Sequence, residues 1–382
     1  MMDAPLFPVT TVGSWPRPDV VLDAQRRRRR DRLSRPEFER IADAAVRDLV
    51  RLQEDIGCDI LTDGELRRDN FYSFVADKLS GVRLMTLAEM LDVVEDKPGF
   101  ERLLQTLDVP AYTIRNPVCV GRLERREPFV LDDVRFLRTL TSRPIKATLP
   151  GPYLLTRAMY VVELTRQVYP TKEDLAIDVV RLLREEVLAL AAAGVDFIQL
   201  DEPVLSEVVF APGATRTFMC AALAARKDPA DELEFAVSLI NGVVDGVSGP
   251  RFGVHVCRGN WSRDESTLLA GNYHPLAPYF ARLQVDQLIL EYATPRAGEV
   301  LEFSGKELGL GVVNPRTGTV ESPADICRVV ERALMLYPPE ALFLNPDCGF
   351  ATFSERPMNH AAVATQKLRA SVAAARVLRG HQ

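Results

Sequence analysis

The sequence predicts an α/β fold, specifically a single (β/α)8 TIM barrel that spans residues 1–382. Eight apolar runs of strand length are mostly separated by helical patterns, which is the order of elements in such a barrel. Polar residues recur at the carboxyl ends of these runs, where barrel enzymes build their active sites. A doubly wound sheet is the alternative, but no GxGxxG follows the first run and no GxxxxGK occurs, so nucleotide binding is disfavoured.

Each expected strand is a short run of mainly apolar residues, the pattern of strands buried within a parallel sheet. In chain order, the expected strands are Pro8–Gly13, Asp59–Glu65, Pro144–Pro150, Phe197–Pro203, Phe252–Cys257, Gln287–Tyr292, Leu308–Asn314 and Ala341–Pro346.

The longest interval lies between the second and third expected strands. We expect residues 71–144 to form an insertion of helices plus a hairpin, because hydrophobic residues alternate within Ala111–Leu123. This insertion is the natural place for a lid or a contact with a partner chain, although the sequence leaves the oligomeric state open.

Capping residues mark the expected helices. Thr171, with Asp174 three positions later, predicts a helix that Gly194 closes. Ser322–Asp325 supply an N-cap, a proline at the first helical position and a capping acid for another helix. An alanine-rich segment after Pro357 predicts the last helix.

The composition excludes several classes of function. The formal net charge is −6, which offers no basic surface for nucleic acid. No apolar run approaches the roughly 18 residues that a membrane-spanning helix needs, and the N-terminus lacks the pattern of a secretory signal. Six scattered cysteines in so long a chain are not a disulfide framework. We therefore expect a cytoplasmic protein that binds small molecules.

Four side chains at the ends of expected strands form a candidate metal site. His255 and Cys257 lie two positions apart and point to the same face of one strand. Glu291 and Cys348 follow two other strands. Histidine, cysteine and glutamate are all ligands of zinc, and two sulfurs argue against magnesium or calcium. A His-x-Cys pair alone is weak evidence, since a single histidine is more often a core residue.

Seven segments together resemble one family. They are TTVGSWPRP, TDGELRRDNF, QLDEPVL, HVCRGN, LEYA, LGLGVVNPRTGTVESP and LFLNPDCGF. In this combination they resemble the catalytic domain of cobalamin-independent methionine synthase and its shorter single-barrel relatives. The likeness runs from Val9 to about Phe350.

The resemblance implies zinc-dependent transfer of a methyl group to the thiol of homocysteine, which would form methionine. It implies zinc coordination by His255, Cys257, Glu291 and Cys348. It also implies that Val12, Gly13 and Ser14 hold the substrate carboxylate, whereas Glu65 and Asp201 hold its amino group and serve catalysis. Chemistry agrees with this, because zinc deprotonates a coordinated thiol. We expect the substrate thiolate to displace or loosen Glu291.

The methyl donor stays open. Where long members of the family place a histidine that is proposed to donate a proton to the departing folate, this chain has Asn314, and a carboxamide cannot supply a proton. The donor is therefore a folate, a corrinoid or another alkyl compound. Two alternatives remain. One is a different zinc-dependent thiol alkyltransferase or thioether- or epoxide-processing enzyme. The other is a non-catalytic or metal-free barrel, in which the four ligand positions are coincidental. For Asp201 itself, the alternative to a role in substrate binding is that it only caps the following segment.

Overall fold

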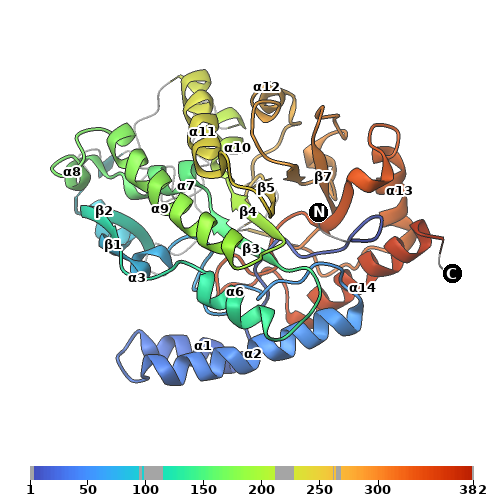
Figure 1. Cartoon of the computed structure of the whole chain (residues 1–382), viewed down its shortest axis with the longest axis horizontal. Helices are drawn as coiled ribbons and strands as arrows, with labels where there is room; N and C mark the ends of the chain where they lie inside the picture. Colours follow the sequence, from blue (N-terminus) through green and yellow to red (C-terminus); the bar gives the residue numbers. More distant parts are fainter. Residues whose placement is uncertain are drawn as a thin grey trace.

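The computed structural model describes residues 4–93, 97–98, 115–210, 228–260, 262–263 and 268–380. Its centre is a parallel sheet in the order β3-β4-β5-β6-β7-β8, with helices around it (Figure 1). These six strands confirm the third to eighth expected strands, and almost all of their residues are buried, as in a sheet covered on both faces. The strands are β3 Lys146–Pro150, β4 Phe197–Asp201, β5 Arg251–Val256, β6 Gln287–Leu290, β7 Glu307–Val313 and β8 Leu342–Pro346.

The parallel register brings the carboxyl ends of the strands to one edge of the barrel. Asp201, the last residue of β4, is paired with His255 of β5. Val256 of β5 is paired with Leu290, the last residue of β6. The residues that follow these strands therefore leave the sheet at the same level, and side chains far apart in the sequence meet there.

The first two expected strands, Pro8–Gly13 and Asp59–Glu65, are not regular strands. The first segment forms a single parallel bridge from Val9 to β8, and the second forms one from Leu61 to the residue before β3. The amide of Asp59 donates to the carbonyl of Val9 (2.9 Å). Backbone hydrogen bonds thus connect β8 to β3 through both segments, but the regular ladder has six strands rather than the expected eight.

Proline and side-chain acceptors explain this difference. Pro8 has no N–H to donate to a neighbouring strand. The amide of Val9 donates to the carboxylate of Asp59 (2.8 Å), and the amide of Thr62 donates to the side chain of Gln53 (3.1 Å). Because side chains accept these backbone donors, the donors are not available to a continuous ladder.

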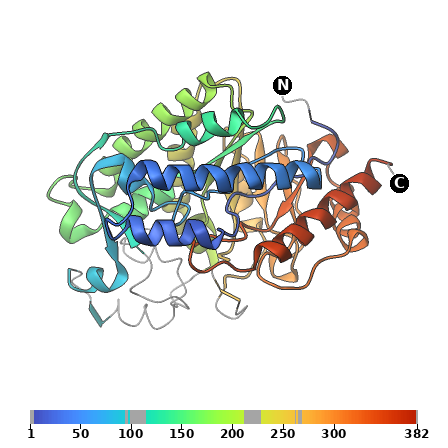
Figure 2. The same ribbon diagram turned by 90° about the horizontal axis from the view of Figure 1, so that it is seen from below.

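Helices surround the barrel and cover its outer face. The α-helices are α1 Asp19–Arg28, α2 Arg35–Ile56, α3 Val75–Lys78, α4 Leu87–Leu91, α6 Leu131–Arg138, α7 Pro152–Met159, α8 Val162–Thr165, α9 Lys172–Ala192, α10 Val204–Phe210, α11 Pro229–Val244, α12 Ala277–Phe280, α13 Pro323–Ala333 and α14 Ala361–Leu378. Short 3-10 turns occupy η2 His274–Leu276, η3 Pro295–Ala297 and η4 Pro339–Ala341. Figure 2 shows α1 lying beside the longer α2, which also contacts α14.

The expected helix caps are confirmed. The Thr171 side chain accepts from the backbone N–H of Asp174, and Asp174 accepts from the backbone of Thr171 in return, at the start of α9. Ser322 and Asp325 form the same reciprocal capping box at the start of α13. Gly194, just after α9, has a φ of 74°, a conformation that glycine adopts without strain. Among the described helices, none is both long and apolar enough to cross a membrane.

The segment between Leu61 and β3 contains an antiparallel pair of strands, β1 Leu79–Thr86 and β2 Arg115–Arg125. Of the expected hairpin at Ala111–Leu123, residues 111–114 lie outside the described part of the chain. The described remainder belongs to β2 and is paired with the earlier β1, so it does not fold back on itself. In sequence, α3 precedes this pair, α4 lies between its two strands and α6 follows it.

Candidate metal and substrate site

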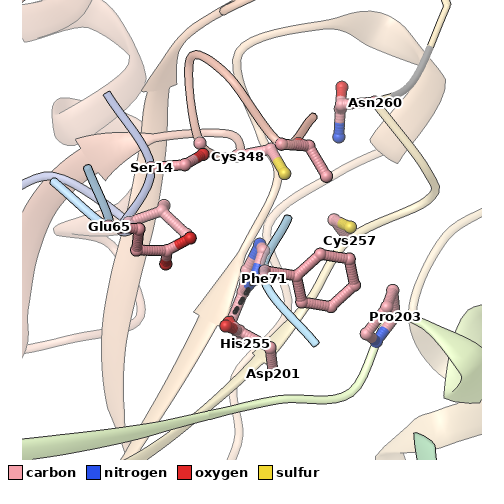
Figure 3. Close-up of a pocket in the computed structure, with 13 residues that line it drawn as sticks. Ser14, Glu65, Phe71, Asp201, Pro203, His255, Cys257, Asn260 and Cys348 are labelled. Carbon is pink, nitrogen blue, oxygen red and sulfur yellow. Dashed lines mark hydrogen bonds and ion pairs between the residues drawn. The ribbon is translucent and has the colours of Figure 1, made fainter. Parts of the chain in front are cut away.

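Three side chains with metal-binding atoms meet at the carboxyl end of the barrel. His255 lies in β5, Cys257 follows that strand, and Cys348 follows β8 (Figure 3). All three are buried, and their ligand atoms lie within 4.8 Å of one another. The structure thus brings together three of the four expected metal ligands from two distant segments, as a group that could hold a metal ion.

The pKa values of His255, Cys257 and Cys348 are shifted in different directions. Burial lowers the pKa of His255, but its hydrogen bonds with Asp201 and Cys257 outweigh burial and raise that pKa to about 10. A hydrogen bond with Cys348 lowers the pKa of Cys257 to about 6, against the effect of burial. The same hydrogen bond, together with burial, raises the pKa of Cys348 well above its ordinary value. Without a metal ion, neutral pH therefore favours a protonated imidazole beside one thiolate and one neutral thiol.

Glu291, the fourth expected ligand, lies outside this group. Its carboxylate accepts from the backbone N–H of Arg258 (3.0 Å), from the guanidinium of Arg296 (2.9 Å) and from the side-chain amide of Asn260. The side chain is fully buried, so these partners fix its position. The role of Glu291 as a metal ligand therefore stays a prediction.

Asp201 faces both the histidine and the pocket. Its Oδ1 lies 3.0 Å from Nδ1 of His255 and accepts from Nε2 of Gln199 (2.7 Å). Because Asp201 of β4 is paired with His255 of β5, the carboxylate lies beside the imidazole. The neighbouring Glu202 has a different role, because its two oxygens accept from the backbone N–H groups of Tyr153 (2.8 Å) and Leu154 (2.9 Å) at the start of α7.

The five expected substrate-binding residues line one pocket together with the three metal-binding side chains. These residues are Val12, Gly13, Ser14, Glu65 and Asp201. In Figure 3, Ser14 and Glu65 lie on one side of the pocket, Asn260, Cys257 and Pro203 lie on the other, and the sulfur of Cys348 lies between them. The pocket is therefore lined by side chains that could bind a metal ion next to acids that could bind a cation.

Glu65 is the least satisfied polar group in this pocket. Its Oε1 accepts from Oγ1 of Thr148 (2.9 Å), but its Oε2 is buried without a hydrogen-bond partner among the described residues. Burial raises the pKa of Glu65, and the carboxylate of Asp201 adds to this effect, whereas Arg68 opposes it. Its backbone φ of 53° is rare for a non-glycine residue, and such strain clusters at functional sites. A cationic ligand would satisfy this oxygen.

Gly13 leaves the space that the Glu65 carboxylate occupies. A Cβ at position 13 would lie 2.3 Å from Oε1 of Glu65 and 3.2 Å from Cγ2 of Thr148. We expect Gly13→Ala to lower the free energy of unfolding by about 1–3 kcal/mol, because one of these side chains must move. Chemical denaturation measures the change, with Gly318→Ala as the control, since a Cβ there meets no atom within 4 Å. Equal stability of both variants would contradict the expectation.

The pocket includes residues that the sequence did not single out. Four of them lie within the quoted segments, so their motifs could have indicated them: Phe71 in TDGELRRDNF, Pro203 in QLDEPVL, Asn260 in HVCRGN and Gly349 in LFLNPDCGF. A Cβ at Gly349 would lie 2.1 Å from Oγ of Ser14, which accounts for a glycine there. Thr352 also lines the pocket, and no pattern in the sequence marked it.

Asn314 has a local structural role. Its side-chain oxygen accepts from the backbone N–H of Arg316 (3.0 Å), and its backbone N–H donates to the carboxylate of Glu321 (2.8 Å). This turn directs the buried Arg316 toward Asn260, to which its Nε donates (3.0 Å). Asn314 does not line the pocket described above.

Comparisons with solved structures agree with the fold. A B12-independent methionine synthase from Shewanella sp. W3-18-1, in complex with selenomethionine, superposes with a TM-score of 0.75 at 24% identity, and the match covers 98% of each chain. A protein from Listeria monocytogenes described as a B12-independent methionine synthase gives a TM-score of 0.69 at 22% identity over 99% of each chain. These likenesses support the α/β barrel architecture.

Sequence comparisons show the family. A methionine synthase of Thermococcus kodakarensis is 30% identical over 96% of this chain and 92% of its own length. A 5-methyltetrahydropteroyltriglutamate–homocysteine methyltransferase of Thermotoga maritima is 27% identical over 92% of this chain, which spans only 42% of that longer protein. The model of the cobalamin-independent synthase catalytic domain matches residues 7–228 and 252–377. The chain therefore belongs to the cobalamin-independent synthase family.

Proposed function

We propose that the protein is a zinc-dependent methyltransferase that transfers a methyl group to the thiol of homocysteine and forms methionine. The observation behind this proposal is that three metal-binding side chains and two acidic side chains line the same pocket. The names of the relatives support the reaction, since they are methionine synthases and a homocysteine methyltransferase. A metal-free binding module would have no use for a buried group of one histidine and two cysteines.

Zinc fits the side chains that are present. One imidazole and two thiols, buried within 4.8 Å of one another, match the nitrogen and sulfur ligands that zinc prefers, whereas magnesium and calcium prefer oxygen. Catalytic zinc sites have three protein ligands and one position for a substrate. We propose that His255, Cys257 and Cys348 are the three ligands, and that Glu291 is the ligand that gives way to the substrate.

Zinc, when bound, would lower the pKa of the substrate thiol so that it reacts as a thiolate. The residues of the chain orient that thiol. Glu65 and Asp201 would accept hydrogen bonds from the ammonium group of homocysteine, and the buried Oε2 of Glu65 would gain its missing partner. The segment Val12–Ser14 would hold the carboxylate through N–H and hydroxyl groups. Phe71 and Pro203 would exclude water from the reacting sulfur.

Substrate recognition by Glu65 can be tested by Glu65→Gln. We expect the KM for homocysteine to rise about 10- to 100-fold, because hydrogen bonds to charged groups contribute roughly 1.5–3 kcal/mol. Steady-state kinetics with varied homocysteine measures this change. Glu202→Gln is the matched control, since it removes another buried carboxylate that binds backbone N–H groups and lies outside the pocket. An unchanged KM in Glu65→Gln would contradict the assignment.

The reaction itself is tested with zinc-loaded protein and homocysteine. Each of three donors is supplied in turn: methyltetrahydrofolate with a polyglutamate tail, methylcobalamin, and a small methyl thioether. Methionine is measured by mass spectrometry. Formation of methionine with at least one donor supports the proposal and identifies the donor class. Zinc binding without methionine from any donor would instead favour another thiol alkyl transfer at the same metal site.

A further inference from the structure

A lysine inside the barrel has no part in the chemistry described so far. Lys146, on β3, is 3% exposed, and its ammonium donates to the carbonyl of Thr11 and to Oε1 of Gln199 (3.0 Å). Burial lowers the pKa of Lys146 to about 7, although the carboxylates of Asp201 and Glu65 oppose this effect. Burying an ammonium group is unfavourable unless its hydrogen bonds are satisfied, so Lys146 depends on the two acceptors that it contacts.

The ammonium group determines how the amide of Gln199 is oriented. Lys146 has enough N–H groups to donate to both of its acceptors whether its amine is charged or neutral, and the charged form cannot accept a hydrogen bond. The oxygen of the Gln199 amide must therefore face Lys146, and its NH2 group must face the opposite way. On that side Nε2 of Gln199 donates to Oδ1 of Asp201 (2.7 Å). The orientation of this amide thus follows from its partner on β3.

Asp201 orients the imidazole of His255 in a similar way. Oδ1 of Asp201, which accepts from Gln199, also lies 3.0 Å from Nδ1 of His255. A carboxylate only accepts, so Nδ1 must carry a proton. In the protonated imidazole Nε2 also carries a proton, and it lies 3.4 Å from the carbonyl of Asp347. Which of the two protons leaves when a metal ion binds therefore depends on how firmly Asp201 holds Nδ1.

We propose that Lys146 is a positioning residue that acts through Gln199 and Asp201 to keep a proton on Nδ1 of His255, and so presents Nε2 to the metal ion. The inference rests on the proposed function, because it takes zinc to be the metal. The ammonium also binds the carbonyl of Thr11, immediately before the pocket segment Val12–Ser14. One buried cation therefore connects the metal-binding histidine with the segment expected to bind the substrate carboxylate.

Removal of the Lys146 amine should disturb the hydrogen bonds that lead from it through Gln199 and Asp201 to His255. Lys146→Met has a similar length and no donor, so nothing then holds the Gln199 oxygen on the β3 side. The buried oxygen of Gln199 would then lack its donor, which is unfavourable, so the Gln199 side chain is expected to shift and to weaken its hydrogen bond to Asp201. Asp201 would lose its fixed position, and with it the anchor of the His255 ring. Partners of metal-binding histidines typically change metal affinity 10- to 100-fold when they are removed.

The experiment uses the full chain loaded with zinc and needs neither homocysteine nor a methyl donor. Zinc affinity is measured by competition with a chromophoric chelator in the parent protein, Lys146→Met and Gln199→Leu. Nuclear magnetic resonance of 15N-histidine-labelled protein reports which ring nitrogen of His255 is protonated. The chain has four histidines, so the spectrum is simple, and loss of one signal in His255→Gln assigns it.

Lys306→Met is the matched control. Its ammonium, also partly buried, donates to the carbonyls of Leu283 (2.6 Å) and Val285 (2.8 Å), and it lies just before β7, at the opposite end of the barrel from the metal-binding side chains. This variant removes an ammonium with two acceptors and leaves the chain from β3 to His255 intact. Thermal unfolding of all variants separates a loss of stability from a change at the histidine.

We expect Nδ1–H with zinc on Nε2 in the parent protein. We expect zinc to bind 10- to 100-fold more weakly, with a shifted or lost Nδ1–H signal, in Lys146→Met and Gln199→Leu, and no change in Lys306→Met. Zinc on Nδ1 in the parent would overturn the inference, as would parental affinity and an unchanged signal in folded Lys146→Met. If Lys146→Met does not fold, Gln199→Leu decides in the same way. Failure of the methyl transfer assay with zinc bound would overturn the proposed reaction alone.

Discussion

Replacing Cys348 by serine is expected to abolish zinc retention under conditions in which the parent protein keeps about one ion per chain. A serine hydroxyl is not deprotonated near neutral pH and is a poor zinc ligand. Structural sites with four ligands bind zinc with about 10–16 kcal/mol, so the loss of one ligand is expected to weaken binding roughly a hundredfold or more. Elemental analysis after gel filtration with a chelator measures the retained metal.

The control for this prediction is Cys327→Ser. Cys327 is a buried thiol on α13, with its sulfur 3.9 Å from the carbonyl of Ala374, and it is not part of the three-residue group. Its replacement removes a buried sulfur without touching the site, so zinc content should stay at the parental level. Parental zinc content in Cys348→Ser would show that the metal, if present, binds elsewhere.

Zinc binding at pH 8 is expected to release about two protons, and the affinity is expected to rise about a hundredfold for each pH unit near that pH. In the absence of metal, the pKa of His255 is about 10 and that of Cys348 is well above its ordinary value, so both are protonated at pH 8. The pKa of Cys257 is about 6, so this thiol has already lost its proton. Metal ligands bind in their deprotonated forms, and two protons must therefore leave.

Zinc affinity is therefore expected to fall as the pH is lowered. Below about pH 6, Cys257 is protonated as well, and a third proton must then leave. Isothermal titration calorimetry in buffers with different ionisation enthalpies counts the released protons. Cys327→Ser should release the same number as the parent, since its thiol lies outside the site. An affinity that does not change between pH 7 and pH 9 would contradict the protonation states derived for His255 and Cys348.

The sequence predicted the regular part of the barrel because local patterns determine it. Strands β3 to β8 are short, mainly apolar runs, and capping boxes at Thr171 and Ser322 mark helices that the structure contains. The site could be predicted from the same pattern, since polar residues at the carboxyl ends of parallel strands meet at one edge. His255, Cys257 and Cys348 come together for this reason.

The rest depends on contacts between distant residues, which a pattern in the sequence does not contain. The first two segments are not regular strands because side chains such as Asp59 and Gln53 accept their backbone hydrogen bonds. Glu291 is not in the group of three side chains whose ligand atoms lie within 4.8 Å of one another, and Arg296 and Asn260 bind its carboxylate. Lys146, in the middle of an apolar run, gave no indication of its link to His255.

The two walls of the pocket differ in how many of their residues pair with the sheet. The metal-binding residues lie in or directly after strands that are paired along their length, whereas Val12–Ser14 and Glu65 lie on segments that pair with the sheet at one residue each. Fewer backbone hydrogen bonds must break for these segments to move. We therefore expect the wall proposed to bind the amino-acid end of the substrate to adjust more readily than the wall that carries the two cysteines, so that related thiols share one reactive centre.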